Sequence, residues 1–226
     1  MMSIITMNKF IFLCLLSLII SKHVVLIGDS RFVGMANLLM GFSYSTIINS
    51  GGTGSNIRST SARSFDGHSI QVTAQVSASS YTFKSGTDIY KSVHYQLKNS
   101  VAGTVVLLWL GINDTNAVQS TIDFYKNLAK AYPTLIFKAV SVTGVNQSKT
   151  WIKNDSVKNF NSQLQAKVKS AGCSNLSYVS ILSGTDVNTI IAGGKKVAIV
   201  NYMSGDGLHY TKDGYSFLWK AMKSKI

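Results

Sequence analysis

The sequence has few prolines, which are common in linkers between domains, and few cysteines, which form disulfides. Its 226 residues include a single proline and two cysteines. A proline-rich linker is therefore excluded, and one domain is expected, since α/β folds often reach this length as one unit. Cys14 lies in an apolar run far from Cys173, which leaves the folded domain without a cysteine pair for an internal disulfide. HExxH and paired-cysteine spacings are absent, so we expect neither a metal nor a cofactor.

Acidic residues are also scarce. Nine Asp and Glu stand against 22 Lys and Arg, which gives a formal net charge of +13. Such a chain is attracted to anionic surfaces, whether nucleic acid, acidic lipid or wall polymer. Its lysines are scattered, however, and no basic run is interleaved with aromatic residues as in nucleic-acid-binding segments. The charge favours an anionic envelope or polysaccharide as partner over specific nucleic-acid binding.

The N-terminus carries a short apolar run. Met7-Asn8-Lys9 supplies a basic residue, and residues 10–20 are apolar but too few for a confident membrane span, which is typical of a signal-peptide core. We therefore predict a signal peptide or N-terminal membrane anchor over residues 1–21, a domain over residues 22–226, and a secreted or envelope-associated location. Because no A-x-A cleavage site is visible, a buried first element over residues 10–20 is the alternative.

Strand and helix patterns alternate along the rest of the chain. This βαβα order predicts a parallel sheet with helices on both faces. Residues 51–85 are rich in Ser, Thr and Gly and are predicted to form an irregular insertion that shapes a pocket. The strands are expected at residues 24–27, 44–48, 104–110, 134–142 and 176–182, and the helices at 32–40, 87–97, 122–132, 156–171 and 212–225.

Three short segments supply reactive side chains: Gly28-Asp29-Ser30, Gly111-Ile112-Asn113-Asp114 and Asp206-Gly207-Leu208-His209. Each is a weak signal alone. The first two follow apolar strands, however, and ligands of open parallel sheets bind at the carboxyl ends of the strands. A serine hydroxyl needs an imidazole to take its proton, and the imidazole needs an acceptor that fixes its tautomer. The order of the segments therefore predicts Ser30 as nucleophile, His209 as base and Asp206 as its partner.

An acyl-transfer site also needs donors for the oxyanion of the tetrahedral intermediate. The Asn113 amide and the glycines near Gly54 are the candidates. Plainer roles compete with these assignments, since Ser30 or Asn113 could simply cap a helix. His68 and His94 have no partner motif and are expected at solvated surface positions.

The chain resembles the GDSL-type esterases of the SGNH hydrolase superfamily, and the match runs from residue 24 to residue 209. The resemblance implies a three-layer α/β/α sandwich with a central, mainly parallel five-stranded sheet of flavodoxin-like type. It also implies that Ser30 is the nucleophile and contributes its N–H to the oxyanion hole. Gly54 would be the second donor, with Gly52 as the alternative. The family's remaining functional positions fall on Asn113, preceded by Gly111, and on Asp206 and His209. Arg31 departs from the family's leucine, which makes the substrate side less predictable.

The function expected from this resemblance is a serine esterase that cleaves small acyl esters through an acyl-enzyme. Acetyl groups on a carbohydrate or envelope glycan are favoured, because an exported, positively charged protein suits such a substrate. A membrane-associated lipid esterase or lysophospholipase is one alternative. A non-catalytic glycan-binding domain on the same fold is the other.

Overall fold

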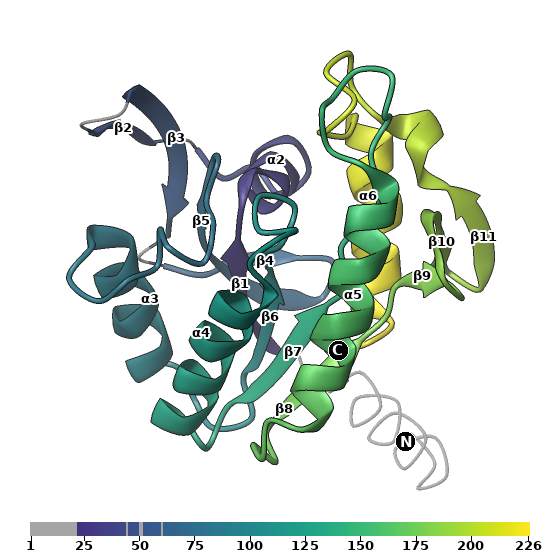
Figure 1. Cartoon of the computed structure of the whole chain (residues 1–226). Helices are drawn as coiled ribbons and strands as arrows, with labels where there is room; N and C mark the ends of the chain where they lie inside the picture. The colour runs from purple at the N-terminus through teal and green to yellow at the C-terminus, as the bar shows by residue number, and fades with distance from the viewer. Residues whose placement is uncertain (1–21, 44, 50–51, 60) are drawn as a thin grey trace, which may run out of the picture.

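The computed structural model describes residues 22–43, 45–49, 52–59 and 61–226 (Figure 1). The signal peptide, membrane anchor or buried first element predicted for residues 1–21 lies outside this part of the chain. Within it, no helix has both the length and the apolar character needed to cross a membrane.

The main sheet has eight strands, with the order β2-β3-β5-β1-β6-β7-β8 and β4 paired to β5. Five neighbouring strands run parallel, as predicted. They are β5 (His68–Gln75), β1 (His23–Gly28), β6 (Val105–Trp109), β7 (Ile136–Val140) and β8 (Leu176–Val179). Numbered along the chain, their order is 2-1-3-4-5, that of flavodoxin-like sheets, in which ligands bind where the direction of winding reverses. That point lies between β1 and β6.

Helices cover both faces of this sheet (Figure 1). One layer holds α2 (Ser30–Leu38) and α6 (Lys212–Lys223), which pack on each other. The opposite layer holds α3 (Asp88–Lys98), α4 (Val118–Ala131) and α5 (Asn154–Lys169). The predicted three-layer α/β/α sandwich is therefore confirmed, and all five expected helices are present with bounds shifted by a few residues.

The two central strands are apolar throughout because both of their faces are covered. Residues 24–27 of β1 are fully buried, and every residue of β6 is at most 1% exposed. Strand β1 ends at Gly28, where a Cβ would lie only 2.5 Å from the carbonyl oxygen of Trp109. The sequence signal for these two strands is accordingly clear.

The predicted second strand is wrong in its pairing. Strand β2 (Ser45–Asn49) pairs antiparallel with β3 (Gly52–Arg58), and this hairpin projects at one end of the sheet (Figure 1). The place beside β1 belongs instead to β5, which comes from the region predicted to be irregular. Strand β4 (Arg63–Phe65) also comes from this region. In β5 only Ile70, Val72 and Ala74 alternate as buried apolar residues, a pattern too short to reveal its central position.

A second, three-stranded sheet was not expected from the sequence. It has the order β11-β10-β9 and is formed by β9 (Leu182–Ser183), β10 (Asp186–Ala192) and β11 (Lys195–Ala198). A 3-10 helix at Ile199–Tyr202 follows and leads into the turn that carries Asp206 and His209. This small sheet packs against α6, so it supports the approach to that turn.

Candidate active site

Ser30 lies where strand β1 turns into helix α2. Asp29 is the N-cap of α2, and its side chain accepts a hydrogen bond of 3.0 Å from the backbone N–H of Arg31. Ser30 is the first helical residue and is 5% exposed. The alternative that Ser30 is the cap is therefore wrong, because Asp29 fills that position. The first N–H groups of a helix lack intrahelical acceptors, so the Ser30 N–H is available to a ligand.

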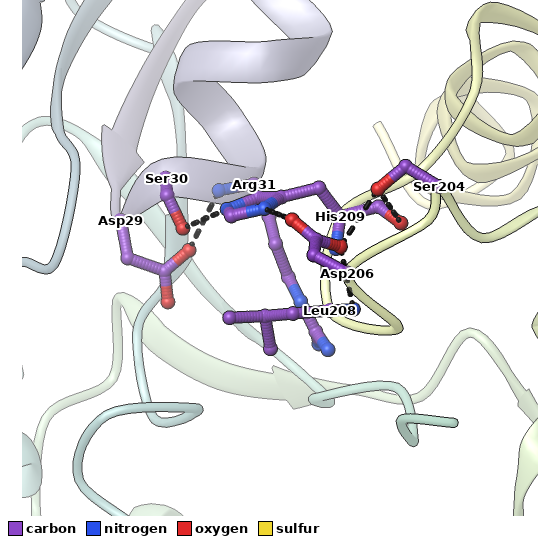
Figure 2. Close-up of polar contacts among 7 residues, drawn as sticks. All are labelled: Asp29, Ser30, Arg31, Ser204, Asp206, Leu208 and His209. Atoms are coloured by element: carbon purple, nitrogen blue, oxygen red, sulfur yellow. Dashed lines mark hydrogen bonds and ion pairs between the residues drawn. The ribbon is translucent and has the colours of Figure 1, made fainter. Parts of the chain in front are cut away.

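His209 lies in a tight turn whose backbone is held by the Asp206 carboxylate (Figure 2). Asp206 Oδ1 accepts hydrogen bonds from the backbone N–H groups of Leu208 at 2.9 Å and of His209 at 3.0 Å. It also accepts one from Ser204 Oγ at 2.7 Å. Gly207 has a φ of +69°, in the left-handed region that favours glycine. The turn thus fixes the aspartate and the histidine on one short frame.

The structure brings Ser30, His209 and Asp206 together in one chain of hydrogen bonds. His209 Nε2 lies 2.8 Å from Ser30 Oγ, across a separation of 179 residues in the sequence. Its other ring nitrogen, Nδ1, lies 2.5 Å from Asp206 Oδ2. A serine, an imidazole and a carboxylate in this order have the geometry that general-base activation of a hydroxyl requires.

The two aspartates near the serine have opposite electrostatic environments. Partial burial acts to raise the pKa of Asp206, but hydrogen bonds from the His209 side chain and from the turn outweigh it and lower the pKa well below its usual range. Asp206 is therefore ionised at neutral pH. Complete burial raises the pKa of Asp29 to about 6, against the lowering effect of the neighbouring Arg31 guanidinium.

Arg31 points into the protein interior and is 1% exposed. Its guanidinium donates to the carbonyl oxygen of Thr143 at 2.9 Å, to Thr143 Oγ1 at 3.1 Å and to the carbonyl oxygen of Gly144 at 3.2 Å. It also lies 5.9 Å from the ring centre of Trp109 and 5.4 Å from that of Tyr210. Tyr210 follows His209 directly. The sequence associated Arg31 with the substrate side, whereas the structure makes it a buried link between the serine helix and the histidine turn.

Asn113 follows β6 at the same rim of the sheet as Ser30. Its Nδ2 donates to the carbonyl oxygen of Ala78 at 2.9 Å, and the amide has a second N–H for another acceptor. The N-cap of α4 is Ala117, so the alternative that Asn113 caps this helix is wrong. The next residue, Asp114, is buried and accepts the backbone N–H of Ser80 at 2.7 Å. These bonds tie the segment after β5 to the Asn113 loop.

The predicted second oxyanion donor lies in a strand rather than in a glycine-rich turn. Gly54 is opposite Ile47, and Gly52 is opposite Asn49, in the β2–β3 hairpin. Pairing of β3 with β5 begins only at Asn56. The choice between Gly54 and Gly52 stays a prediction.

The two histidines predicted at solvated positions are half-buried instead. The ring of His68 packs against that of Trp219 with ring centres 6.1 Å apart. His94 Nδ1 lies 2.6 Å from the hydroxyl of Tyr132. These aromatic partners are distant in sequence, so no local pattern could reveal them. Across the described residues, no group of three or more His, Cys, Asp or Glu side chains could hold a metal ion.

Comparison with known proteins gives a likeness in structure only. No family model and no curated protein matches the sequence. Among solved structures, a lipase/acylhydrolase from Enterococcus faecalis superposes with a TM-score of 0.52 and 14% identity, over 91% of this chain and 95% of that one. This chain has the SGNH hydrolase fold.

Two further structures share the SGNH hydrolase fold with this chain. A Bacteroides ovatus protein that is named for its likeness to GDSL lipases has a TM-score of 0.53 and 12% identity over 91% of this chain. A salicylyl-acyltransferase from a tetracycline biosynthetic pathway has a TM-score of 0.50 and 10% identity over 90% of this chain. The chain spans only 52% and 53% of these two proteins. At such identities the likeness concerns the fold, and the activity has to be argued from the site.

Proposed function

We propose that this protein is a serine ester hydrolase that works through an acyl-enzyme. The observation that carries the proposal is the continuous contact from Ser30 Oγ through the His209 ring to the Asp206 carboxylate, at 2.8 and 2.5 Å. The site lies at the carboxyl end of β1, next to the point where the winding of the sheet reverses, which is where such folds bind ligands.

In the proposed reaction, His209 Nε2 accepts the proton of Ser30 while Oγ attacks the ester carbonyl carbon. The ionised Asp206 stabilises the imidazolium that forms. The oxyanion accepts hydrogen bonds from the Ser30 N–H and the Asn113 amide, with the Gly54 N–H as the third donor. His209 then protonates the departing alcohol, and the acyl group stays on Ser30.

Deacylation repeats these steps with water. His209 removes a proton from the water, whose oxygen attacks the acyl carbon. As the intermediate collapses and the bond to Ser30 Oγ breaks, the His209 imidazolium returns the proton to Oγ. The products are a carboxylic acid and the free enzyme. The named acyltransferase shares the fold, and an alcohol that replaced water in this step would make the reaction a transfer.

For the substrate we propose a small acyl ester, with acetyl on a carbohydrate or envelope glycan as the first choice. The net charge of +13 supports an anionic envelope surface as the setting. We also propose that residues 1–21 direct or anchor the protein outside the cytoplasm, as their composition suggests. A lipid esterase and a non-catalytic glycan-binding domain remain the competing functions.

The test compares hydrolysis of p-nitrophenyl acetate, butyrate and octanoate by the purified protein and by Ser30→Ala. Ser170→Ala, at the exposed end of α5, is the matched control. We expect activity highest on acetate, unchanged in the control and lost in Ser30→Ala. An organofluorophosphonate should phosphonylate Ser30 Oγ only and release HF, so that the protein gains the mass of the phosphonyl group less one hydrogen.

Preference for octanoate would replace the glycan ester with a lipid ester. A folded protein that hydrolyses none of the three esters and does not react with the phosphonate would contradict the proposed function. The non-catalytic glycan-binding domain would then be the better account.

A further inference from the structure

A hollow lies between α3, α4 and the segment that follows β5. Its volume is about 420 Å³, which falls within the range of small-molecule sites. The lining residues that matter here are Tyr81, Tyr90, His94, Ser120, Asp123 and Asn127. None of them takes part in the triad or in the proposed oxyanion hole.

The topology places one wall of this cavity at the catalytic rim. Strand β5 is parallel to β1 and in register with it, with Ala74 opposite Gly28. The chain therefore leaves β5 at the edge of the sheet where Ser30 lies. Ser80, which lines the cavity, donates its backbone N–H to Asp114 at 2.7 Å. The wall is thus hydrogen-bonded to the loop that carries Asn113.

The accessible lining of the cavity has the chemistry of a sugar site. Tyr81 is 55% exposed, and the Tyr90 and His94 rings are half-buried. Sugar rings place C–H groups against such aromatic faces, while their hydroxyls bond to polar side chains. The Asp123 carboxylate and the Asn127 amide are exposed beside these rings and supply acceptors and donors.

Several apolar side chains at the cavity are packed into the core and are not open to a ligand. The large apolar residues at the cavity are already packed: Phe83 is 2% exposed, Phe124 8% and Leu128 1%. The rings of Phe83 and Phe124 stack on each other with centres 5.1 Å apart. The apolar surface that a ligand can reach therefore comes from other lining residues, among them Tyr81 and Tyr90.

Several of these side chains are held in place before any ligand arrives. The His94 ring lies 4.1 Å from the Tyr90 ring, and its Nδ1 is 2.6 Å from the Tyr132 hydroxyl. Asp123 Oδ1 accepts a hydrogen bond of 2.9 Å from Gln119 Nε2. Pre-organised groups lose less side-chain freedom on binding, which favours affinity.

We propose that this cavity binds a sugar unit of the glycan that carries the scissile ester, and so acts as a glycan subsite beside the triad. The inference rests on the proposed function for the identity of the ester. It is a statement about recognition, however, and binding can test it without turnover. The subsite would raise the affinity for an acetylated oligosaccharide over that for a small ester with the same acyl group.

The first experiment measures kcat and KM on acetylated xylo-oligosaccharides, on O-acetylated chito-oligosaccharides and on p-nitrophenyl acetate. Tyr81→Ala and Asp123→Ala change exposed cavity residues that are expected to leave the fold intact. Tyr95→Ala is the matched control, since this tyrosine is 60% exposed on α3, the helix of Tyr90 and His94, and is not part of the cavity lining. We expect KM for an oligosaccharide to rise at least fivefold in the cavity variants, with the p-nitrophenyl acetate constants unchanged and no effect in Tyr95→Ala.

The second experiment measures binding of both oligosaccharide sets by calorimetry in the Ser30→Ala background. The cavity variants should raise Kd at least fivefold, and Tyr95→Ala should leave it unchanged. Binding that persists in a protein inactive on every ester would contradict the proposed function and support the subsite. No binding of either set, equal losses on all substrates, or a rise in KM for the octanoate ester alone would overturn the subsite.

Discussion

The two halves of the triad are built in different ways. On the serine side, Asp29, Ser30 and Arg31 are at most 5% exposed and follow a strand that is buried from Val24 to Gly28. On the histidine side, the His209 and Asp206 side chains are 32% and 50% exposed and belong to a turn. Core packing fixes the nucleophile, whereas local hydrogen bonds fix the base and its carboxylate. The position of a nucleophile is therefore protected by global stability, and that of its base by a few contacts.

Arg31 connects the two halves. Its helix begins at the serine, and its guanidinium reaches Thr143, Gly144 and the ring of Tyr210. Tyr210 in turn bonds to Thr143, with 2.6 Å between the hydroxyl oxygens. A buried cation with several oxygen acceptors can hold the exposed half of the site against the buried half. The comparison can be tested by changing each half and the link between them.

The largest effect is expected on the histidine side, from Asp206→Asn. The amide can still accept from the turn, but it no longer fixes the His209 tautomer or stabilises the imidazolium. We expect kcat on p-nitrophenyl acetate to fall by about 10³–10⁴-fold, with a melting temperature close to that of the parent. A loss of activity that follows unfolding in circular dichroism would instead place Asp206 among the residues that hold the fold.

On the serine side, Asp29→Asn should change the pH dependence of stability. The folded pKa of Asp29 is raised from 3.8 to about 6 by burial. An acid with a raised folded pKa stabilises the fold fully below its unfolded pKa, and this contribution is lost as the pH rises through the folded value. In the parent, this effect lowers the free energy of unfolding by about 3 kcal/mol between pH 3 and pH 7, and Asp29→Asn should abolish that decrease.

Urea unfolding at pH 3, 5 and 7 measures this difference, and Asp88→Asn at an exposed position is the control. The free energy of unfolding of Asp29→Asn should increase relative to that of the parent as the pH rises. Parallel pH profiles for Asp29→Asn and the parent would show that Asp29 titrates normally in the fold.

The link itself is tested by Arg31→Leu, which restores the residue type of the GDSL motif. Loss of the donors to Thr143 and Gly144 should loosen Tyr210 and misplace His209. We expect kcat to fall by about 10–100-fold with KM within twofold, since small displacements of a catalytic group are costly. Arg63→Leu is the control, because Arg63 also donates to a carbonyl group and lies over a ring, that of Phe42.

A purely structural role for Arg31 would lower the melting temperature and leave kcat unchanged at a temperature where the variant is folded. That result would show that Arg31 does not position His209 relative to Ser30.

The smallest effect distinguishes two glycines. Gly28→Ala places a Cβ 2.5 Å from the Trp109 carbonyl oxygen in the core, and should lower the free energy of unfolding by about 1–3 kcal/mol. Gly207 lies in the histidine turn and has a left-handed backbone conformation, and Gly207→Ala places a Cβ 2.7 Å from the Cβ of Lys149. It should lower kcat by about tenfold and the free energy of unfolding by about 1–2 kcal/mol, because a non-glycine residue at positive φ strains the folded state. A Gly207→Ala variant with the kcat of the parent would contradict the role of this turn in positioning His209.

The sequence could predict what depends on nearby residues. The apolar runs of β1 and β6 end in glycine and placed Ser30 and Asn113 at one rim. The spacing of Asp206 and His209 indicated a shared turn. The pairing of strands that are distant in sequence could not be predicted, because three alternating apolar residues in β5 do not indicate which strand lies beside them. The same limit applies to Arg31, whose acceptors are 112 and 113 residues away.

The separation of 179 residues between Ser30 and His209 also has a consequence for synthesis. Strand β1 is synthesised before β5 and β6, yet it lies between them in the sheet and must wait for both. The histidine turn follows only after the small sheet has been made. Domains fold largely as units during translation, so the nascent protein carries its nucleophile without its base until residue 209 has left the ribosome.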